Sequence, residues 1–276
     1  MLFRDTGDTT VAIPQPSHAW LSGQAMRAWG NAEFGAVTPA EDVCLAAEQH
    51  DIGWLSWEQE PTLNPDTGRP HSFRELGVVQ HTAIWGQGSA MAQAFGRYPA
   101  LLVSLHGTGL YRNFDLANAD PEAADAVHGF LRTQVQLQQR LTAGLAADHR
   151  YAPHVSAAAI ERNRRLVSAA DRLSIAICTG LRDIAVSAEF DGEGWLRDVP
   201  TARAMVDIHI RALDAGRTRF ALHPWPFAAA SARLSCEGVE LPHARFADET
   251  AMRTALRDGR RVVVAAELTP ADRLPG

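Results

Sequence analysis

Residues 44–54 have the sequence CLAAEQHDIGW, and this stretch decides which fold we expect. Just before it, TPAE at residues 38–41 combines a capping box with an early proline, which predicts a helix start. One face of that helix is marked by residues at helical spacing, namely Ala40, Val43, Ala47 and His50. His50 and Asp51 should therefore end a helix whose apolar face turns inward, and Gly53 allows the chain to leave.

Around this stretch, segments with helical periodicity carry an ordered set of six imidazole and carboxylate groups: His18, His50, Asp51, His81, His106 and Asp171. Imidazole and carboxylate together suit transition metals such as Fe, Mn, Zn or Ni. The set exceeds what one tetrahedral structural ion needs, whereas two ions that share a bridging carboxylate would use all of it. These residue types predict a binuclear transition-metal site.

The stretch CLAAEQHDIGW resembles the signature of the HD superfamily of helical metalloenzymes. Members of that superfamily bring a histidine from an earlier helix and an aspartate from a distant one. His18 matches the early histidine, and AADRLSIA at residues 169–176 supplies Asp171 in a matching setting. His81 and His106 match the two intervening histidines of the binuclear subgroup. The segments QPSHAWLSGQ, HDIGWLSWE, NPDTGRP and LLVSLHG also resemble an uncharacterised bacterial family of HD-like proteins.

This resemblance implies a cofactor of two transition-metal ions, with iron favoured and Mn, Ni or Zn as alternatives. The first ion would be held by His18, His50, Asp51 and Asp171. The second ion would be held by Asp51, His81 and His106, with Asp51 as the bridge. His50 and Asp51 would be the catalytic pair. We expect nearby polar side chains to orient the ligands, namely Gln15, Gln24, Gln49, Ser104 and Arg172.

The sequence departs from many HD phosphohydrolases at Trp54, where those enzymes have a lysine that helps to bind phosphate. Trp57 follows three residues later, and Trp85 lies one helical turn beyond His81. These indoles predict a substrate pocket with apolar walls. The same side chains can instead be ordinary core aromatics. Arginines near the ligands could bind an anionic group bidentately, and the candidates are Arg69, Arg74 and Arg97.

The periodicity predicts a mostly α fold, an HD-type helical bundle with a β-rich C-terminal extension, and thus α+β overall. Residues 1–180 would form the helical metal-binding domain and residues 181–276 a β-rich subdomain. Alternation predicts strands at residues 206–210, 219–223, 232–235, 239–241 and 261–266, with a tight turn at Glu237-Gly238. The strands can form a separate domain or a sheet laid on the bundle.

Composition narrows the partners of this chain of 276 residues. The net charge of −6 argues against nucleic acid and anionic membranes, and no apolar run reaches the length of a membrane span. All 26 basic residues are arginines, so Schiff-base chemistry and a P-loop lysine are excluded. Three scattered cysteines fit a reducing cytoplasm. We therefore expect a cytoplasmic protein that binds a small molecule, with O2 as a possible co-substrate and a homodimer as a possible assembly.

Two enzyme classes fit this set of residues. A diiron oxygenase of the HD type, acting on a small organic substrate, is favoured because the lysine is lost and tryptophans surround the ligands. A metal-dependent phosphohydrolase acting on a nucleotide or phosphate ester is the alternative, since most HD proteins have that activity. A non-catalytic metal-containing sensor is a third possibility, although a complete ligand set argues against it.

Overall fold

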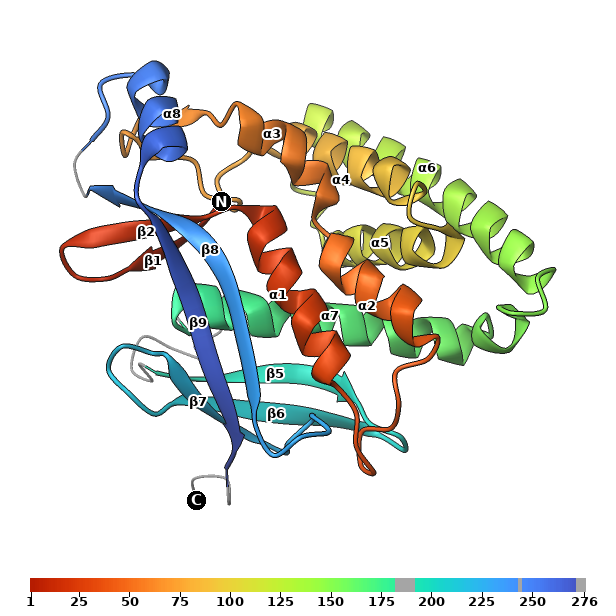
Figure 1. The fold of residues 1–276 in the computed structure, drawn as a ribbon. Coiled ribbons are helices and arrows are strands. Elements are labelled where there is room, and N and C mark those ends of the chain that lie inside the picture. Colours follow the sequence, from red (N-terminus) through yellow and green to blue (C-terminus); the bar gives the residue numbers. More distant parts are fainter. Residues whose placement is uncertain (182–191, 243–244, 272–276) are drawn as a thin grey trace.

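A computed structural model describes residues 1–181, 192–242 and 245–271. Within these ranges seven strands form one curled mixed sheet in the order β1-β2-β8-β9-β7-β6-β5 (Figure 1). Its strands are β1 (Leu2–Asp5), β2 (Thr9–Ile13), β5 (Glu193–Pro200), β6 (Met205–Ala212), β7 (Arg219–His223), β8 (Ala232–Pro242) and β9 (Arg261–Pro270). Strands β7 and β9 pair in parallel, and the other neighbours are antiparallel. Strands β3 (Leu63–Asn64) and β4 (Arg69–Pro70) form a separate short hairpin.

The longer helices are α1 (Gln15–Ala28), α2 (Ala40–Gln49), α4 (Val78–Ala92), α5 (Arg97–Leu110), α6 (Pro121–Ala146) and α7 (Ala157–Thr179). The other helices are η1 (Ile52–Trp54), α3 (Leu55–Gln59), η2 (Ala152–His154) and α8 (Glu249–Asp258). Helices α1 and α7 lie between the sheet and the other helices, and they contact both (Figure 1). This position places them at the centre of the molecule, where they can carry buried polar side chains.

The prediction of a helical bundle with strands confined to a C-terminal extension is wrong. The sheet is a major part of the fold, and it recruits the first residues of the chain as β1 and β2. Strand β2 pairs with β8, with Thr10 opposite Leu241 and Ala12 opposite Val239. A pairing between residues so far apart in the chain leaves no local periodicity, so it was missed. The division into two domains at residue 180 stays a prediction.

The capping box predicted at TPAE is wrong, since Pro39 is the N-cap residue of α2 and no side chain caps the first turn of that helix. Two other helices do have side-chain caps. Asp120 caps α6 and Ser156 caps α7, each by accepting a hydrogen bond from a backbone N–H in the first turn. Gly180 ends α7 in the left-handed conformation, with φ 63°. The predicted turn at Glu237-Gly238 is wrong, because β8 runs straight through it. Gly238 is required there because a Cβ would lie 2.5 Å from Val11 Cγ1 on the neighbouring β2.

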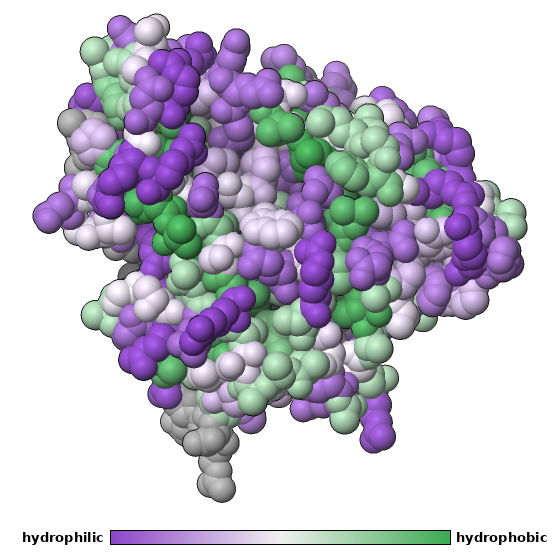
Figure 2. Space-filling model, in the orientation of Figure 1, coloured by the Kyte–Doolittle hydropathy of each residue, from purple (hydrophilic) through white to green (hydrophobic). Residues whose placement is uncertain are grey.

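One hydrophobic core joins the sheet to the helices. It includes fully buried side chains from both ends of the chain and from its middle, among them Leu2, Leu101, Leu173, Ile208 and Leu268. The face shown in Figure 2 mixes hydrophilic and apolar residues, and hydrophilic side chains cover α8. Among the described helices, none combines the length and the apolar character needed to cross a bilayer.

Gly53 is the point at which η1 packs directly on α4. A Cβ on Gly53 would overlap the carbonyl oxygen of Ile84 and would lie 2.9 Å from the Cα of Gly88. The backbones therefore meet without intervening side chains. This close approach fixes the position of Asp51, which lies two residues before Gly53 at the start of η1.

Replacing Gly53 with alanine should lower the free energy of unfolding by about 1–3 kcal/mol, because the added methyl group forces η1 away from α4. Urea denaturation measures this change. Gly86→Ala, on the same helix α4 with no neighbouring atom within 4 Å of its Cβ position, is the matched control. It should leave stability unchanged or raise it by up to about 1 kcal/mol. Equal effects of the two substitutions would contradict the proposed close contact.

Candidate metal centre

Four separate elements bring imidazoles and carboxylates to one buried point. Helix α1 supplies His18, the end of α2 supplies His50 and Asp51, α5 supplies His106, and α7 supplies Asp171. These residues form two buried groups that could hold a metal ion, His18-His50-Asp51 and His50-His106-Asp171. Asp171 is the most accessible of the five, with 13% of its side chain exposed. The sequence-predicted residues therefore do meet in space, apart from His81.

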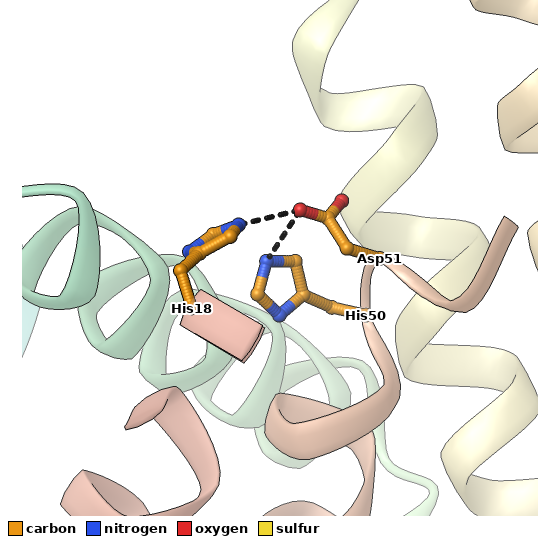
Figure 3. A group of neighbouring side chains, drawn as sticks. All are labelled: His18, His50 and Asp51. Atoms are coloured by element: carbon orange, nitrogen blue, oxygen red, sulfur yellow. Dashed lines mark hydrogen bonds and ion pairs between the residues drawn. The ribbon is translucent and has the colours of Figure 1, made fainter. Parts of the chain in front are cut away.

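His50 is oriented by its own helix. Its Nδ1 donates a hydrogen bond to the carbonyl oxygen of Ala47 at 2.8 Å, and a carbonyl can only accept, so Nδ1 carries the proton. In the neutral ring, Nε2 then presents a lone pair. That Nε2 lies 3.5 Å from Asp51 Oδ2 (Figure 3) and 3.2 Å from Asp171 Oδ1. It makes no hydrogen bond within the described residues.

His18 is held in the same way by α7. The Ser174 hydroxyl oxygen lies 2.7 Å from His18 Nδ1 and 2.7 Å from the Asp171 backbone oxygen, so it fixes the orientation of the His18 ring. The other nitrogen of His18, Nε2, lies 2.6 Å from Asp51 Oδ2. Figure 3 shows the Asp51 carboxylate facing both imidazole rings.

Both histidines thus direct an Nε2 at carboxylate oxygens in a buried place. A lone pair facing a carboxylate is repulsive, and water is too scarce there to weaken the repulsion. The arrangement is stable only with a cation between the groups, either a proton or a metal ion. A histidine whose Nδ1–H is fixed by a carbonyl or hydroxyl oxygen is the usual form of a metal ligand. These residues therefore fit a transition-metal ion.

The electrostatics point the same way. Burial lowers the pKa of His50, but the carboxylates of Asp51 and Asp171 outweigh burial and raise that pKa to about 9. Burial also opposes charge on the two aspartates, yet the neighbouring histidines hold the pKa of both carboxyls below the usual range. Burial lowers the pKa of His106 to about 4, so this imidazole is neutral at pH 7. A proton therefore occupies the cation position when no metal is present.

His81 lies beside this cluster but outside both groups. Its Nε2 accepts a hydrogen bond from Trp85 Nε1 at 3.1 Å, and its Nδ1 lies 2.5 Å from Tyr111 Oη. Both ring nitrogens are therefore engaged. The assignment of His81 to a second metal ion stays a prediction.

A cavity of about 520 Å³ opens next to the cluster. Its lining includes His18, Asp51, His106 and Asp171, and it also includes several residues predicted to bind substrate or orient ligands: Gln15, Trp54, Arg74, Trp85 and Arg172. Apolar side chains complete the wall, namely Phe73, Leu76, Val78, Leu110, Phe114 and Ile175. The cluster therefore forms part of the surface of a predominantly apolar cavity.

Other predicted residues lie elsewhere. Trp57 is buried behind Trp54, with ring centroids 5.8 Å apart. Arg97 binds the Gly144 carbonyl oxygen and the Asp148 carboxylate, each at 2.7 Å, and Arg69 is in the β3–β4 hairpin. The remaining candidates bond away from the ligands: Gln24 to Ser235, Gln49 to Glu48, and Ser104 to Gln134 and Gln138.

The side chain that orients His18 is Ser174, which the sequence analysis missed. It lies three residues after Asp171, so helical spacing alone places it on the same face of α7. Tyr111, which contacts His81, was also missed. Its signal was weaker, because it follows the end of α5 and its contact with His81 depends on how α4 and α5 pack.

The residues of this site lie within the part of the chain that matches a known protein family. Residues 1–243 match the family described as Protein of unknown function (DUF3891). The chain belongs to this family. The range shared with DUF3891 includes every residue of the cluster and of the cavity wall. No curated protein and no solved structure matches this chain.

Metal binding should stabilise the folded protein. Mn²⁺ at about 100 times its Kd adds about 2.7 kcal/mol, which corresponds to a rise in Tm of roughly 5–10 °C. His50→Ala should abolish this rise, because Nε2 belongs to both ligand groups. His149→Ala is the control, since the His149 side chain is 94% exposed. Thermal unfolding with and without Mn²⁺ measures the difference, and an undiminished rise in His50→Ala would exclude the site.

Metal affinity should increase with pH between about 7 and 9. The pKa of His50 is raised from 6.5 to about 9, so in the metal-free protein a proton must leave before metal binds. Affinity should therefore rise up to about tenfold per pH unit until pH 9. The same proton stabilises the metal-free fold below pH 6.5, and that stability is lost as pH rises through about 9. Competition with a fluorescent chelator at pH 7 and 8.5 tests the trend, and a pH-independent affinity would contradict it.

Proposed function

We propose that this protein is a single-metal hydrolase that acts on a small phosphate ester with an apolar organic part. The observation that carries the proposal is the convergence of four imidazole and carboxylate groups on His50 Nε2, beside a cavity with both apolar and cationic walls. The resemblance to the HD superfamily supports the same chemistry, since most of its members are phosphohydrolases.

One ion suits the cluster better than two. The two possible ligand groups share His50, and its Nδ1 is already bonded to Ala47. A single nitrogen lone pair binds one ion, so both groups describe the same place. The mixture of imidazole and carboxylate favours Mn²⁺, Fe²⁺, Zn²⁺ or Ni²⁺ over Mg²⁺ or Ca²⁺. A second ion would require His81 to give up its bonds to Trp85 and Tyr111.

The charges around the cavity favour an anionic substrate. A divalent ion would neutralise Asp51 and Asp171, which leaves Arg172 on the cavity wall as positive charge. Arg172 donates to the carbonyl oxygens of Ser168 and Arg197, and no carboxylate within the described residues makes an ion pair with it. A half-buried guanidinium of this kind is suited to bind a phosphate group.

Two buried polar atoms on the cavity wall also lack a partner among the described residues. They are Gln15 Oε1, an acceptor, and Trp54 Nε1, a donor. Leaving such groups unpaired costs free energy, so we expect Trp54 Nε1 to donate to an oxygen and Gln15 Oε1 to accept from an O–H group, of a ligand or of water. The surrounding apolar side chains would bind the organic part of the substrate and exclude bulk water.

When bound, the metal ion would supply Lewis acidity for polarising a phosphoryl oxygen and for making a water molecule more acidic. The side chains around the ion would bind and orient the substrate. Arg172 orients the phosphate, and Trp54 and Trp85 restrict the position of the organic part. His18 and His50 are held rigidly by Ser174 and Ala47, so the ligand geometry is organised before substrate arrives.

The diiron oxygenase remains the second candidate. It is favoured by the apolar wall and by the presence of His81 in the same cavity. It requires two iron ions and a reaction with O2, which makes the metal count decisive.

Elemental analysis of anaerobically purified protein should give about one metal ion per chain. The protein should hydrolyse p-nitrophenyl phosphate or bis(p-nitrophenyl) phosphate, and a chelator should stop the reaction until Mn²⁺ is restored. Asp51→Asn should lower kcat at least about 100-fold, because it removes a charged ligand. Arg172→Ala should raise KM about tenfold, since it removes a charge-assisted hydrogen bond.

Arg150→Ala is the matched control, because Arg150 is 67% exposed and, among the carboxylates of the described residues, makes an ion pair with Asp148 alone. It should leave both kcat and KM unchanged. About two irons per chain together with O2 consumption would overturn the proposal in favour of the oxygenase. Absence of hydrolysis by the metal-loaded protein would also count against it.

A further inference from the structure

Three side chains of the cavity wall form a hydrogen-bonded chain outside the metal ligands. An indole N–H can only donate, so Trp85 Nε1 donates to His81 Nε2, and that nitrogen carries no proton. The proton of the neutral ring is therefore on Nδ1. Tyr111 Oη lies 2.5 Å from Nδ1 and accepts this proton's hydrogen bond. The direction of the whole chain follows from the chemistry of the indole group.

The hydrogen-bonded series Trp85–His81–Tyr111 ends on a hydroxyl group whose own proton is still available. Tyr111 Oη accepts from His81, and within the described residues it has no other hydrogen-bond partner. Tyr111, His81 and Trp85 all line the cavity beside the metal ligands. The Tyr111 hydroxyl can therefore donate to a ligand in that cavity.

Close packing holds this donor in place. A Cβ on Gly107 would lie 2.8 Å from Trp85 Cε3, so only glycine lets the indole lie flat against α5. The Tyr111 ring packs against Phe130 and Phe114, with centroids 5.5 and 5.9 Å away. A donor fixed in this way loses little entropy when it binds an acceptor.

We propose that Trp85, His81 and Tyr111 form a relay that makes Tyr111 a hydrogen-bond donor to an oxyanion of the ligand. Its ligand class, a phosphate group, rests on the proposed function. Tyr111 would touch the ligand, whereas His81 and Trp85 are positioning residues. His81 is then a part of substrate binding and does not hold a second metal ion.

The neighbouring charges agree with this role. Arg172 on the same cavity wall supplies a positive charge for the anion. Burial raises the pKa of Tyr111 and lowers that of His81, so the phenol keeps its proton and the imidazole stays neutral at pH 7. A neutral hydroxyl donor beside a cation is suited to an oxyanion and adds no charge of its own.

The first test reads the tautomer of His81 by nitrogen-15 NMR of histidine-labelled, metal-free protein, with His81→Gln to assign its signals. The relay requires the Nδ1–H form, with Nε2 as an unprotonated acceptor. The Nε2–H form would overturn the relay whatever the protein catalyses.

The second test uses calorimetry with inorganic phosphate and Zn²⁺-loaded protein. Tyr111→Phe should weaken phosphate binding about tenfold and leave Zn²⁺ binding unchanged, because it removes one hydrogen bond to a charged group. His81→Leu should have the same effect, and Tyr111→Phe combined with His81→Leu should be no worse than either alone. His81→Gln should restore binding to within about threefold, since an amide can both accept from Trp85 and donate to Tyr111.

Opposite results overturn the relay. Any one of three results is enough: the wild-type protein binds no phosphate, Tyr111→Phe binds phosphate with wild-type affinity, or both His81→Leu and His81→Gln lose bound Zn²⁺. The proposed function fails separately: a protein that binds phosphate through Tyr111 but hydrolyses no ester keeps the relay and loses the hydrolase.

Discussion

The hydrogen bond from His50 Nδ1 to the Ala47 carbonyl oxygen is the constraint on which the centre depends. It uses a carbonyl that the end of α2 leaves free, and it fixes which nitrogen of His50 carries the proton. Nε2 must then face the carboxylates of Asp51 and Asp171. Because the place is buried, the repulsion cannot be screened by water, and a cation becomes part of the stable structure. The end of one helix thus determines the chemistry of residues from three others.

Close contact between α1 and α7 supports this geometry. Ser22 on α1 donates to Ser174 on α7 at 2.9 Å, and Ser174 in turn holds His18. These serines are fully buried, and each makes its hydrogen bonds within the helix pair. A satisfied polar network of this kind fixes the rotation of the two helices relative to each other. The sheet packs against both helices on the side opposite the remaining helices, and it thereby holds the candidate metal ligands on α1 and α7 in their relative positions.

The cavity combines features that neither the ligands nor the aromatic residues reveal separately. Trp85 packs on His106, with ring centroids 5.4 Å apart, and also donates to His81. The same indole thus contacts a candidate metal ligand and the chain that ends on Tyr111. A ligand entering the cavity would meet cationic, apolar and hydrogen-bonding groups in one place, as the proposed hydrolysis of a small anionic ester requires.

The sequence alone predicts the helix that ends at His50 and most of the residues that meet at the centre. These follow from short-range rules, since helical spacing and capping act within a few residues. The sheet depends on tertiary structure, because β2, which carries β1 at its other edge, pairs with β8 more than 200 residues away in the chain. The direction in which His81 faces also depends on tertiary packing, because Trp85 bonds to His81 and Gly107 lets the Trp85 indole lie against α5. Local sequence fixes the helix faces, but hydrogen-bond direction and ligand number depend on packing between helices, which no local pattern records.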